Sequence, residues 1–195
     1  MKRFVSLSVV AIALVACTDT SGLSKESSRL PRGNADAVIL VTEYADLQCP
    51  ACQAAHERIS TPLLEKYGDQ IRFEFKHFPL RSLHRYALEA AMASECAADQ
   101  GKFWEFVDLV YKEQKKLDID QLSRWAGALA LDRDLFDRCL ESQIKRDTVL
   151  ADYKEGQELS VSGTPSYFVN GQKIETGFDT LSEAIDAVLG GGMKM

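Results

Sequence analysis

The stretch EYADLQCPACQAAHE, residues 43–57, places two thiols, Cys49 and Cys52, three positions apart. A short, β-branched and almost entirely apolar run, residues 37–44, comes just before the cysteines and predicts a buried strand. Helical spacing of apolar residues follows over 50–67, with glycine as the next residue to stop the helix. The cysteine pair is therefore expected where a strand gives way to a helix.

Four chemistries use two cysteines at this spacing. A c-type haem site needs histidine directly after the second cysteine, but Gln53 stands there. A structural zinc site needs four ligands; His56 could join the pair, yet a fourth partner is missing, so we expect no metal. A permanent crosslink over so small a loop would stabilise little. Redox exchange of the two thiols is the remaining chemistry.

The position of the pair supports redox exchange. Cys49 would lie at a helix N-terminus, where unpaired N–H groups and the helix dipole favour a thiolate and lower its pKa. Pro50 suits the first helical turn, which needs no N–H donor. Cys52 lies one turn further and is expected to be more buried. Cys49 is thus predicted to attack, and Cys52 to resolve the mixed disulfide.

The rest of the chain predicts an α/β architecture. Residues 70–77 alternate as a second strand, and 83–159 have helical spacing throughout. Two short strands, 166–169 and 172–174, flank an Asn-Gly turn, and 181–189 form a closing helix. Removing the helical block leaves a compact βαβ-ββα plan. Pro62 is expected to kink or split the first helix.

The motif CPAC after a strand, with SGTPSYFVNG about 110 residues later, resembles the thioredoxin superfamily. The helical block between these motifs resembles the DsbA-like branch of extracytoplasmic thiol-disulfide oxidoreductases. The phrases KHFPL and DQGKFWEF are similar to Gram-positive and lipoprotein members of that branch. The resemblance covers about residues 36–190 and implies a thioredoxin fold with an all-helical subdomain inserted at about 83–160.

The resemblance also implies roles for particular residues. Thr164 and Pro165 match the cis-proline loop, which packs beside the active-site disulfide and pairs with an extended substrate; the alternative is a trans proline in a turn. Glu43 and Lys76 match a buried acid–base pair under the active site; the alternative is that both face solvent at the strand ends. Other members carry histidine where this chain has Ala51, so we expect a less acidified attacking thiol than in the most oxidising relatives.

The N-terminus predicts export. MKR precedes an apolar stretch too short to span a bilayer as a helix but typical of a signal peptide, residues 1–16. LVAC resembles a bacterial lipobox, which implies lipidation of Cys17; the alternative is a plain secretory signal in which Cys17 is incidental. The polar stretch that follows, within 17–35, is expected to be a flexible tether.

Two further cysteines, Cys96 and Cys139, fall on apolar helix faces. Because an exported chain meets conditions in which disulfides persist, we expect them to form a structural disulfide. The alternative is a pair of buried free thiols. The histidines have no partner that the sequence identifies.

The sequence therefore predicts a membrane-anchored dithiol oxidase in the periplasm or at the outer face of the cell envelope. Its expected substrates are reduced exported proteins, and its expected reoxidant is a DsbB-like membrane partner, with no cofactor beyond the Cys49–Cys52 disulfide. A reductase or isomerase, a copper-delivering protein and a peptide-binding chaperone are the alternatives; no histidine follows His84, which disfavours copper delivery. A net charge of -6 disfavours nucleic acid, and we expect a monomer.

Overall fold

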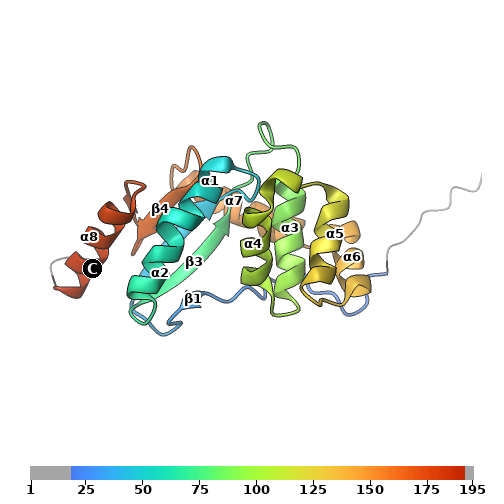
Figure 1. Ribbon diagram of the computed structural model, residues 1–195, viewed down its shortest axis with the longest axis horizontal. Helices are drawn as coiled ribbons and strands as arrows, with labels where there is room; N and C mark the ends of the chain where they lie inside the picture. The colour runs from blue at the N-terminus through green and yellow to red at the C-terminus, as the bar shows by residue number, and fades with distance from the viewer. Residues whose placement is uncertain (1–18, 192–195) are drawn as a thin grey trace, which may run out of the picture.

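The computed structural model describes residues 19–191 and has a five-stranded sheet at its centre (Figure 1). The strand order is β1-β3-β2-β4-β5. The strands are β1 (Arg32–Gly33), β2 (Ile39–Ala45), β3 (Ile71–His77), β4 (Ser166–Val169) and β5 (Gln172–Ile174). The predicted signal peptide, residues 1–16, and Cys17 lie outside the described residues.

The two central strands, β2 and β3, run parallel, and the outer strands are antiparallel to their neighbours. Almost all of β2 is buried, as its continuous apolar run predicts. In β3, buried and half-buried residues alternate, because one face of this strand covers the core and the other carries polar side chains. The C-terminal ends of β2 and β3 therefore meet at one edge of the sheet.

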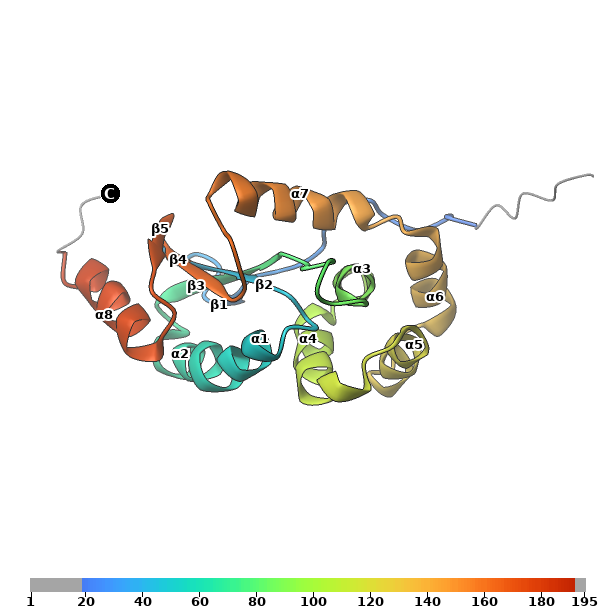
Figure 2. The same cartoon turned by 90° about the horizontal axis from the view of Figure 1, so that it is seen from above.

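Helices cover both faces of the sheet (Figure 2). One face carries α1, α2 and α8, the other face carries α7, and α3 to α6 form a bundle beside the sheet. The helices follow in this order: α1 (Pro50–Ala55), π-helical η1 (His56–Ser60), α2 (Thr61–Tyr67), α3 (Ala87–Ala98), α4 (Phe103–Lys112), 3-10 helical η2 (Gln114–Lys116), α5 (Ile119–Ala128), α6 (Arg133–Ser142), α7 (Arg146–Glu158) and α8 (Phe178–Leu189). The predicted fold class, a thioredoxin fold with a helical insertion, is confirmed.

The first helical region is split, and the split lies before Pro62. Residues His56–Ser60 form a π-helical turn between α1 and α2. Pro62 then occupies the first turn of α2, where its missing N–H leaves no intrahelical bond unmade. The wider π turn absorbs the change of register before the proline.

A disulfide joins Cys96 on α3 to Cys139 on α6. Helix α3 is buried on nearly all sides, because α4, α5, α6 and α7 all pack against it. The large core of the bundle also includes Cys49 and Cys52, so the redox pair lies where the bundle meets the sheet. Within residues 19–191, no helix combines the length and the apolar character needed to cross a bilayer.

Residues 19–33 differ from the flexible tether that the sequence suggested. This segment, the N-terminal strap, runs over the helical bundle and ends in β1 at the edge of the sheet (Figure 1). The fully buried Lys145 donates to the carbonyl oxygen of Glu26 at 2.6 Å, and the Trp104 indole donates to that of Leu30 at 2.8 Å. The sheet therefore begins before residue 36, because the strap's polar backbone finds partners on the domain.

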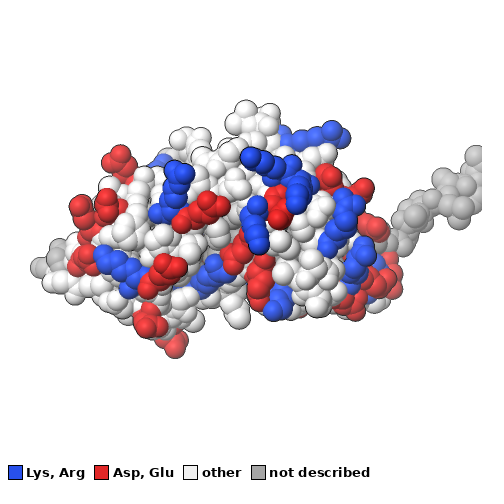
Figure 3. All heavy atoms as spheres, in the orientation of Figure 1, with Lys and Arg blue, Asp and Glu red and all other residues white. Residues whose placement is uncertain are grey.

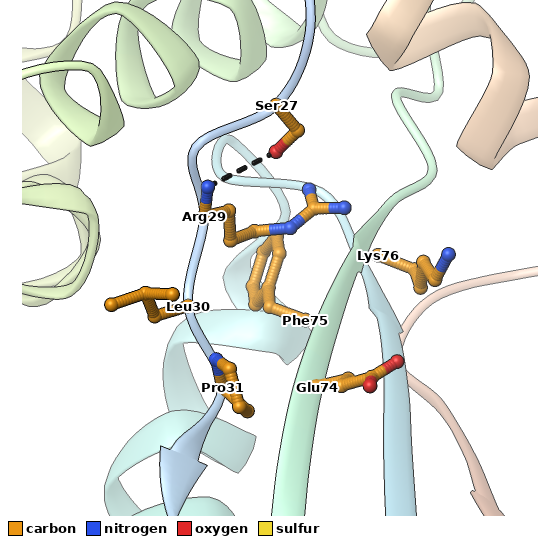
Figure 4. A pocket seen from close by; sticks show the side chains of 7 residues that line it. All are labelled: Ser27, Arg29, Leu30, Pro31, Glu74, Phe75 and Lys76. Atoms are coloured by element: carbon orange, nitrogen blue, oxygen red, sulfur yellow. Dashed lines mark hydrogen bonds between the residues drawn. The ribbon is translucent and has the colours of Figure 1, made fainter. Parts of the chain in front are cut away.

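Arg29 fixes the middle of the strap (Figure 4). Its side chain lies across Phe75 in the close-up, while Lys76 points to the other side of β3. The guanidinium contacts Glu95 at 2.7 Å and Asp152 at 2.9 Å. Burial alone would raise the pKa of Glu95, but the hydrogen bond from His77 and the charge of Arg29 hold this pKa at about 2. A charged network thus ties the strap to α3 and α7.

Candidate active site

Cys49 is the N-cap of α1, and Pro50 occupies the first helical turn. The backbone of Cys49 is extended, with φ of -76° and ψ of 122°, so its side chain lies at the helix N-terminus. Pro50 and Ala51 are exposed, whereas Cys49 is 7% exposed and Cys52 is fully buried. One sulfur can thus be approached from outside while the other is enclosed.

The surroundings of Cys49 favour its thiolate. A hydrogen bond from the Cys52 thiol lowers the pKa of Cys49 most strongly, and this outweighs the opposing effect of burial. Thr164 and the backbone N–H groups of Cys52 and Ala51 lower it further, to about 5. The helix N-terminus therefore contributes part of the stabilisation, as the sequence predicts, and the second thiol contributes the largest part.

Cys52 has the opposite electrostatic environment. Burial raises the pKa of Cys52 far above the ordinary thiol value, and the hydrogen bond to Cys49 raises it further. Its sulfur also accepts a hydrogen bond from the backbone N–H of Asp46, at 3.5 Å. The pair can therefore hold one thiolate and one thiol, with the negative charge on the more accessible sulfur.

The Thr164–Pro165 peptide is cis and lies next to this pair. The Cys49 sulfur is 3.6 Å from the carbonyl oxygen of Thr164. The buried Thr164 hydroxyl has no hydrogen-bond partner among the other described residues, which leaves it free to donate to the Cys49 thiolate. The structure thus brings together the cysteine motif and the threonine-proline motif, 115 residues apart.

Asp46 supports the active-site loop and is a residue that the sequence did not single out. Its carboxylate, almost fully buried, accepts from the backbone N–H groups of Gln48 and Leu80, each at 2.8 Å. It also contacts Nδ1 of His84 at 2.8 Å. Asp46 therefore joins the loop before Cys49 to the loop after β3. Its place three residues before the motif was a usable signal, because Asx turns often precede helices.

A second support comes from the helical bundle. The buried side-chain amide of Gln114 donates to the carbonyl oxygens of Leu47 and Cys49, at 2.9 and 3.0 Å. Gln53 reaches back in the other direction, from α1 to the carbonyl oxygen of Tyr111 at 2.5 Å. These contacts fix α1 against the bundle. No local signal identifies Gln114, since the residues it contacts lie 65 and 67 positions away.

Glu43 and Lys76 do not form the acid–base pair that the sequence suggested. In the parallel register Glu43 lies opposite Phe75, and Lys76 lies opposite Tyr44. Since neighbouring residues of a strand point to opposite faces, Glu43 and Lys76 are on different faces of the sheet. Lys76 instead pairs with Asp152 at 3.3 Å, on the α7 side.

Glu43 is nevertheless buried, on the side of β2 where Ser60 of η1 packs. Its Oε2 accepts from the Ser60 hydroxyl at 2.9 Å, and that hydroxyl is 2.7 Å from the hydroxyl of Tyr167. Burial raises the pKa of Glu43, despite the opposing hydrogen bond from Ser60. Oε1 has no hydrogen-bond partner among the described residues. The arrangement therefore buries a carboxyl group that can hold a proton, and the charges of both this group and Cys52 act on Tyr111 and Tyr167.

The thioredoxin family profile matches residues 25–187, which is most of the chain. The chain belongs to the thioredoxin family. The matched region contains both cysteines of the CPAC motif, the cis-proline loop and the helical bundle between them. The family assignment and the geometry thus agree on the fold that holds the redox pair.

Solved structures place this thioredoxin-family chain near the DsbA-type proteins. It is similar to Wolbachia pipientis alpha-DsbA1, with a TM-score of 0.72 and 26% identity, over 83% of this chain and 91% of that one. It also has the fold of BdbD from Bacillus subtilis, with a TM-score of 0.74 and 22% identity, over 84% of this chain and 94% of that one. The chain is a DsbA-like member of the family.

Longer proteins share the same region. The chain is 39% identical to a segment of the Na(+)/H(+) antiporter NhaA 3 of Salinispora tropica, over 142 residues. This match covers 73% of the chain but 22% of the antiporter. The chain thus spans about a quarter or less of the curated relatives it matches. The likeness concerns the shared segment and carries no transport activity to this chain.

The lowered pKa of Cys49 gives a pH prediction for the reduced protein. Iodoacetamide should alkylate Cys49 with a rate that rises through pH 5 and levels off above about pH 7. Because the folded pKa is depressed, the thiolate stabilises the reduced fold fully above the ordinary value of 9.0, and this stabilisation is lost as the pH falls through about 5. Cys49→Ala is the control and should lack both transitions; a midpoint near 9 would contradict the geometry.

No group of three or more His, Cys, Asp or Glu side chains within residues 19–191 is arranged to hold a metal ion. His56 and His77 pair with acidic side chains, which the sequence alone did not identify. His56 contacts Asp108 at 3.1 Å, and His77 contacts Glu95 at 3.0 Å.

Proposed function

We propose that this chain is an extracytoplasmic dithiol oxidase that introduces disulfides into exported proteins. The supporting observation is that the pKa values of the two thiols shift in opposite directions. The pKa of Cys49 is lowered to about 5, and the pKa of Cys52 is raised. A site that stabilises the reduced thiolate makes the corresponding disulfide a stronger oxidant. The same asymmetry assigns Cys49 as the attacked and leaving sulfur.

The proposed reaction begins from the Cys49–Cys52 disulfide. A client thiolate attacks the Cys49 sulfur, a mixed disulfide forms, and the bond to Cys52 breaks. Cys52 leaves as a thiolate and takes up a proton, since its enclosed site favours the thiol. The second client thiol loses its proton and attacks the client sulfur, so that the client leaves with a disulfide. The enzyme is then a Cys49 thiolate and a Cys52 thiol, two electrons richer.

Other residues have supporting roles in this proposal. The exposed Pro50 and Ala51 and the cis-proline loop of Thr164 and Pro165 would border the bound client, whose extended backbone would pair with that loop. The buried carboxyl of Glu43 would exchange a proton as Cys52 changes state, without help from Lys76.

Disulfide reduction or isomerisation is the alternative that uses the same two thiols. The pKa of about 5 at Cys49 lies between the values of about 7 in thioredoxin and about 3.5 in DsbA. Alanine at position 51, in place of the histidine of other relatives, would acidify Cys49 less than the histidine does in those relatives. The pKa of Cys49 is lowered, which is the direction that an oxidase needs, and a measured potential decides between the two.

The test is a redox equilibrium with glutathione, followed by mass spectrometry of the Cys49–Cys52 pair. We expect a reduction potential between about -200 and -120 mV, well above thioredoxin at about -270 mV. The oxidised protein should then oxidise a dithiol peptide in stoichiometric amount. Cys52→Ala, which cannot form the disulfide, is the control. A potential close to that of thioredoxin would replace the oxidase with a reductase.

We further propose that the protein works in the cell envelope, anchored by lipid at Cys17 after removal of residues 1–16. A DsbB-like membrane protein would then reoxidise the dithiol, and a monomer would suffice, because all proposed site residues come from one chain. Exported proteins in a reduced state would be the clients. Mass spectrometry of the N-terminal peptide from membranes tests the anchor.

A further inference from the structure

A groove of about 460 Å³ lies beside the proposed redox site, between the α1–η1 region and the end of α4 with η2. Cations dominate its lining. They are Arg58, Lys112, Lys115 and Lys116, and all four are exposed. Glu57 and Glu113 are the acidic residues of the same groove. The groove is outside the set of residues that carry out the thiol exchange.

The groove is joined closely to the redox helix. Gln53 lines it, and the backbone N–H of Gln53 donates to the carbonyl oxygen of Cys49 at 3.1 Å. On the other wall, Gln114 follows Lys112 by two residues and donates to the same carbonyl oxygen at 3.0 Å. A ligand in this groove would therefore lie next to the first turn of α1. The hydrogen bonds of Gln53 and Gln114 to Cys49 hold the two walls of the groove in place beside that residue.

The positive charge of the groove is largely unneutralised. Lys116 forms an ion pair with Glu113, but Arg58, Lys112 and Lys115 form none with the residues of 19–191. The chain as a whole has a net charge of -6, so this concentration of unpaired cations runs against its overall balance. Lys and Arg side chains gather over the end of α4 that faces α1 (Figure 3). A surface of this kind attracts carboxylates.

We propose that this groove binds acidic segments of client proteins and so makes the enzyme prefer cysteines with Asp or Glu nearby. The inference rests on the proposed oxidase function. Gln53 and Arg58 of the groove follow Cys49 along the helix by four and nine residues, which is about 6 and 14 Å at a rise of about 1.5 Å per residue. An extended client advances about 3.3 Å per residue, so carboxylates about two to four residues from the client cysteine come within range of the groove while that cysteine is at Cys49. The groove changes client affinity and encounter rate, and it leaves the chemistry of the two thiols unchanged.

The test compares two dithiol peptides that differ only in acidic or amide side chains at those positions. With the full chain, reoxidised by oxidised glutathione after each cycle, we expect kcat/KM to be about tenfold higher for the acidic peptide at about 10 mM salt, where screening is weak. The preference should largely disappear at about 1 M salt, where the screening length is about 3 Å. Arg58→Gln, Lys112→Gln and Lys115→Gln, combined in one variant, should lose the preference through KM and keep the redox potential.

A matched variant controls for loss of charge alone. It combines Lys25→Gln, Arg146→Gln and Lys154→Gln, which lie on the strap and on α7, away from the groove. This variant should keep the preference for the acidic peptide. Equal preferences in the groove variant and the wild type would overturn the proposal. So would a groove variant that lost binding to phosphatidylglycerol vesicles and kept its peptide preference, because the groove would then contact membrane.

Failure of the proposed function would give a different result. If the oxidised full chain oxidised neither peptide, the oxidase proposal would fail, whatever the groove does. Binding of a cysteine-free acidic peptide, followed by fluorescence anisotropy, then decides the groove separately. Binding that the groove variant loses and the control variant keeps supports an acidic-peptide site, and absence of binding to the wild type overturns it.

Discussion

Replacing Cys49 with alanine is expected to abolish thiol–disulfide exchange, with a fall in rate of more than about a thousandfold. Cys49 has the stabilised thiolate, the accessible sulfur and the contact with the cis-proline loop. Cys52 cannot take its place, because its sulfur is fully buried and its pKa is raised. The rate at which the oxidised protein forms a disulfide in a reporter peptide measures this loss.

Cys52→Ala should remain reactive toward clients and should accumulate a covalent intermediate. In this variant the Cys49 thiolate attacks a client disulfide, which is the reverse of the proposed reaction, and forms a mixed disulfide while one client thiolate leaves. Cys52 is absent and cannot displace the client from Cys49, so mixed disulfides should accumulate. Non-reducing electrophoresis and mass spectrometry of the protein isolated from cell envelopes would detect and identify the trapped clients. The double variant, Cys49→Ala with Cys52→Ala, should trap none. Adducts on Cys52 in the Cys49→Ala variant would show that the roles are reversed.

Removal of the Cys96–Cys139 disulfide has the largest expected effect on stability. The disulfide closes a loop with a sequence separation of 43 between α3 and α6. Loop-closure entropy in the unfolded chain then predicts a loss of about 4 kcal/mol in the free energy of unfolding for Cys96→Ala with Cys139→Ala. For a chain of this size the loss corresponds to a Tm lower by about 8 to 16 °C.

Urea unfolding at pH 7 measures this loss, with the active-site pair kept reduced in every protein that has it. The matched control is Cys49→Ala with Cys52→Ala. It removes two cysteines from the same core but removes no crosslink between distant parts of the chain. The Cys96 and Cys139 variant should still oxidise the reporter peptide when it is assayed well below its Tm. A loss of less than about 1 kcal/mol would show that the bundle holds α3 and α6 together without the disulfide.

Features with local signals could be predicted from the sequence. The position of Cys49 at a helix start follows from the apolar strand before it and the proline after it. The β4–β5 hairpin follows from Asn170 and Gly171, both of which have positive φ. Such signals lie within a few residues of the feature they determine, so a single sequence contains them.

Features that depend on distant contacts could not be predicted. Gln114 reaches the active-site loop because the bundle packs against α1, which the sequence near Gln114 does not indicate. The predicted pairing of Glu43 with Lys76 is wrong. The register of β2 against β3 decides which face of the sheet each side chain lies on, and it depends on contacts between the two strands. The strap has the composition of a linker, and it is ordered by partners such as Glu95 and Asp152 on α3 and α7.

The ordered strap limits how far the enzyme could move from a membrane. A free linker of 18 residues would let the domain range up to about 60 Å from its attachment point. Residues 19–33 lie along the domain surface instead. The chain that joins Cys17 to the bound residue Asp19 is therefore two peptide units long and can span at most about 7 Å. If Cys17 carries the proposed lipid, the catalytic domain lies against the surface of the bilayer. Its clients must then come to that surface to be oxidised.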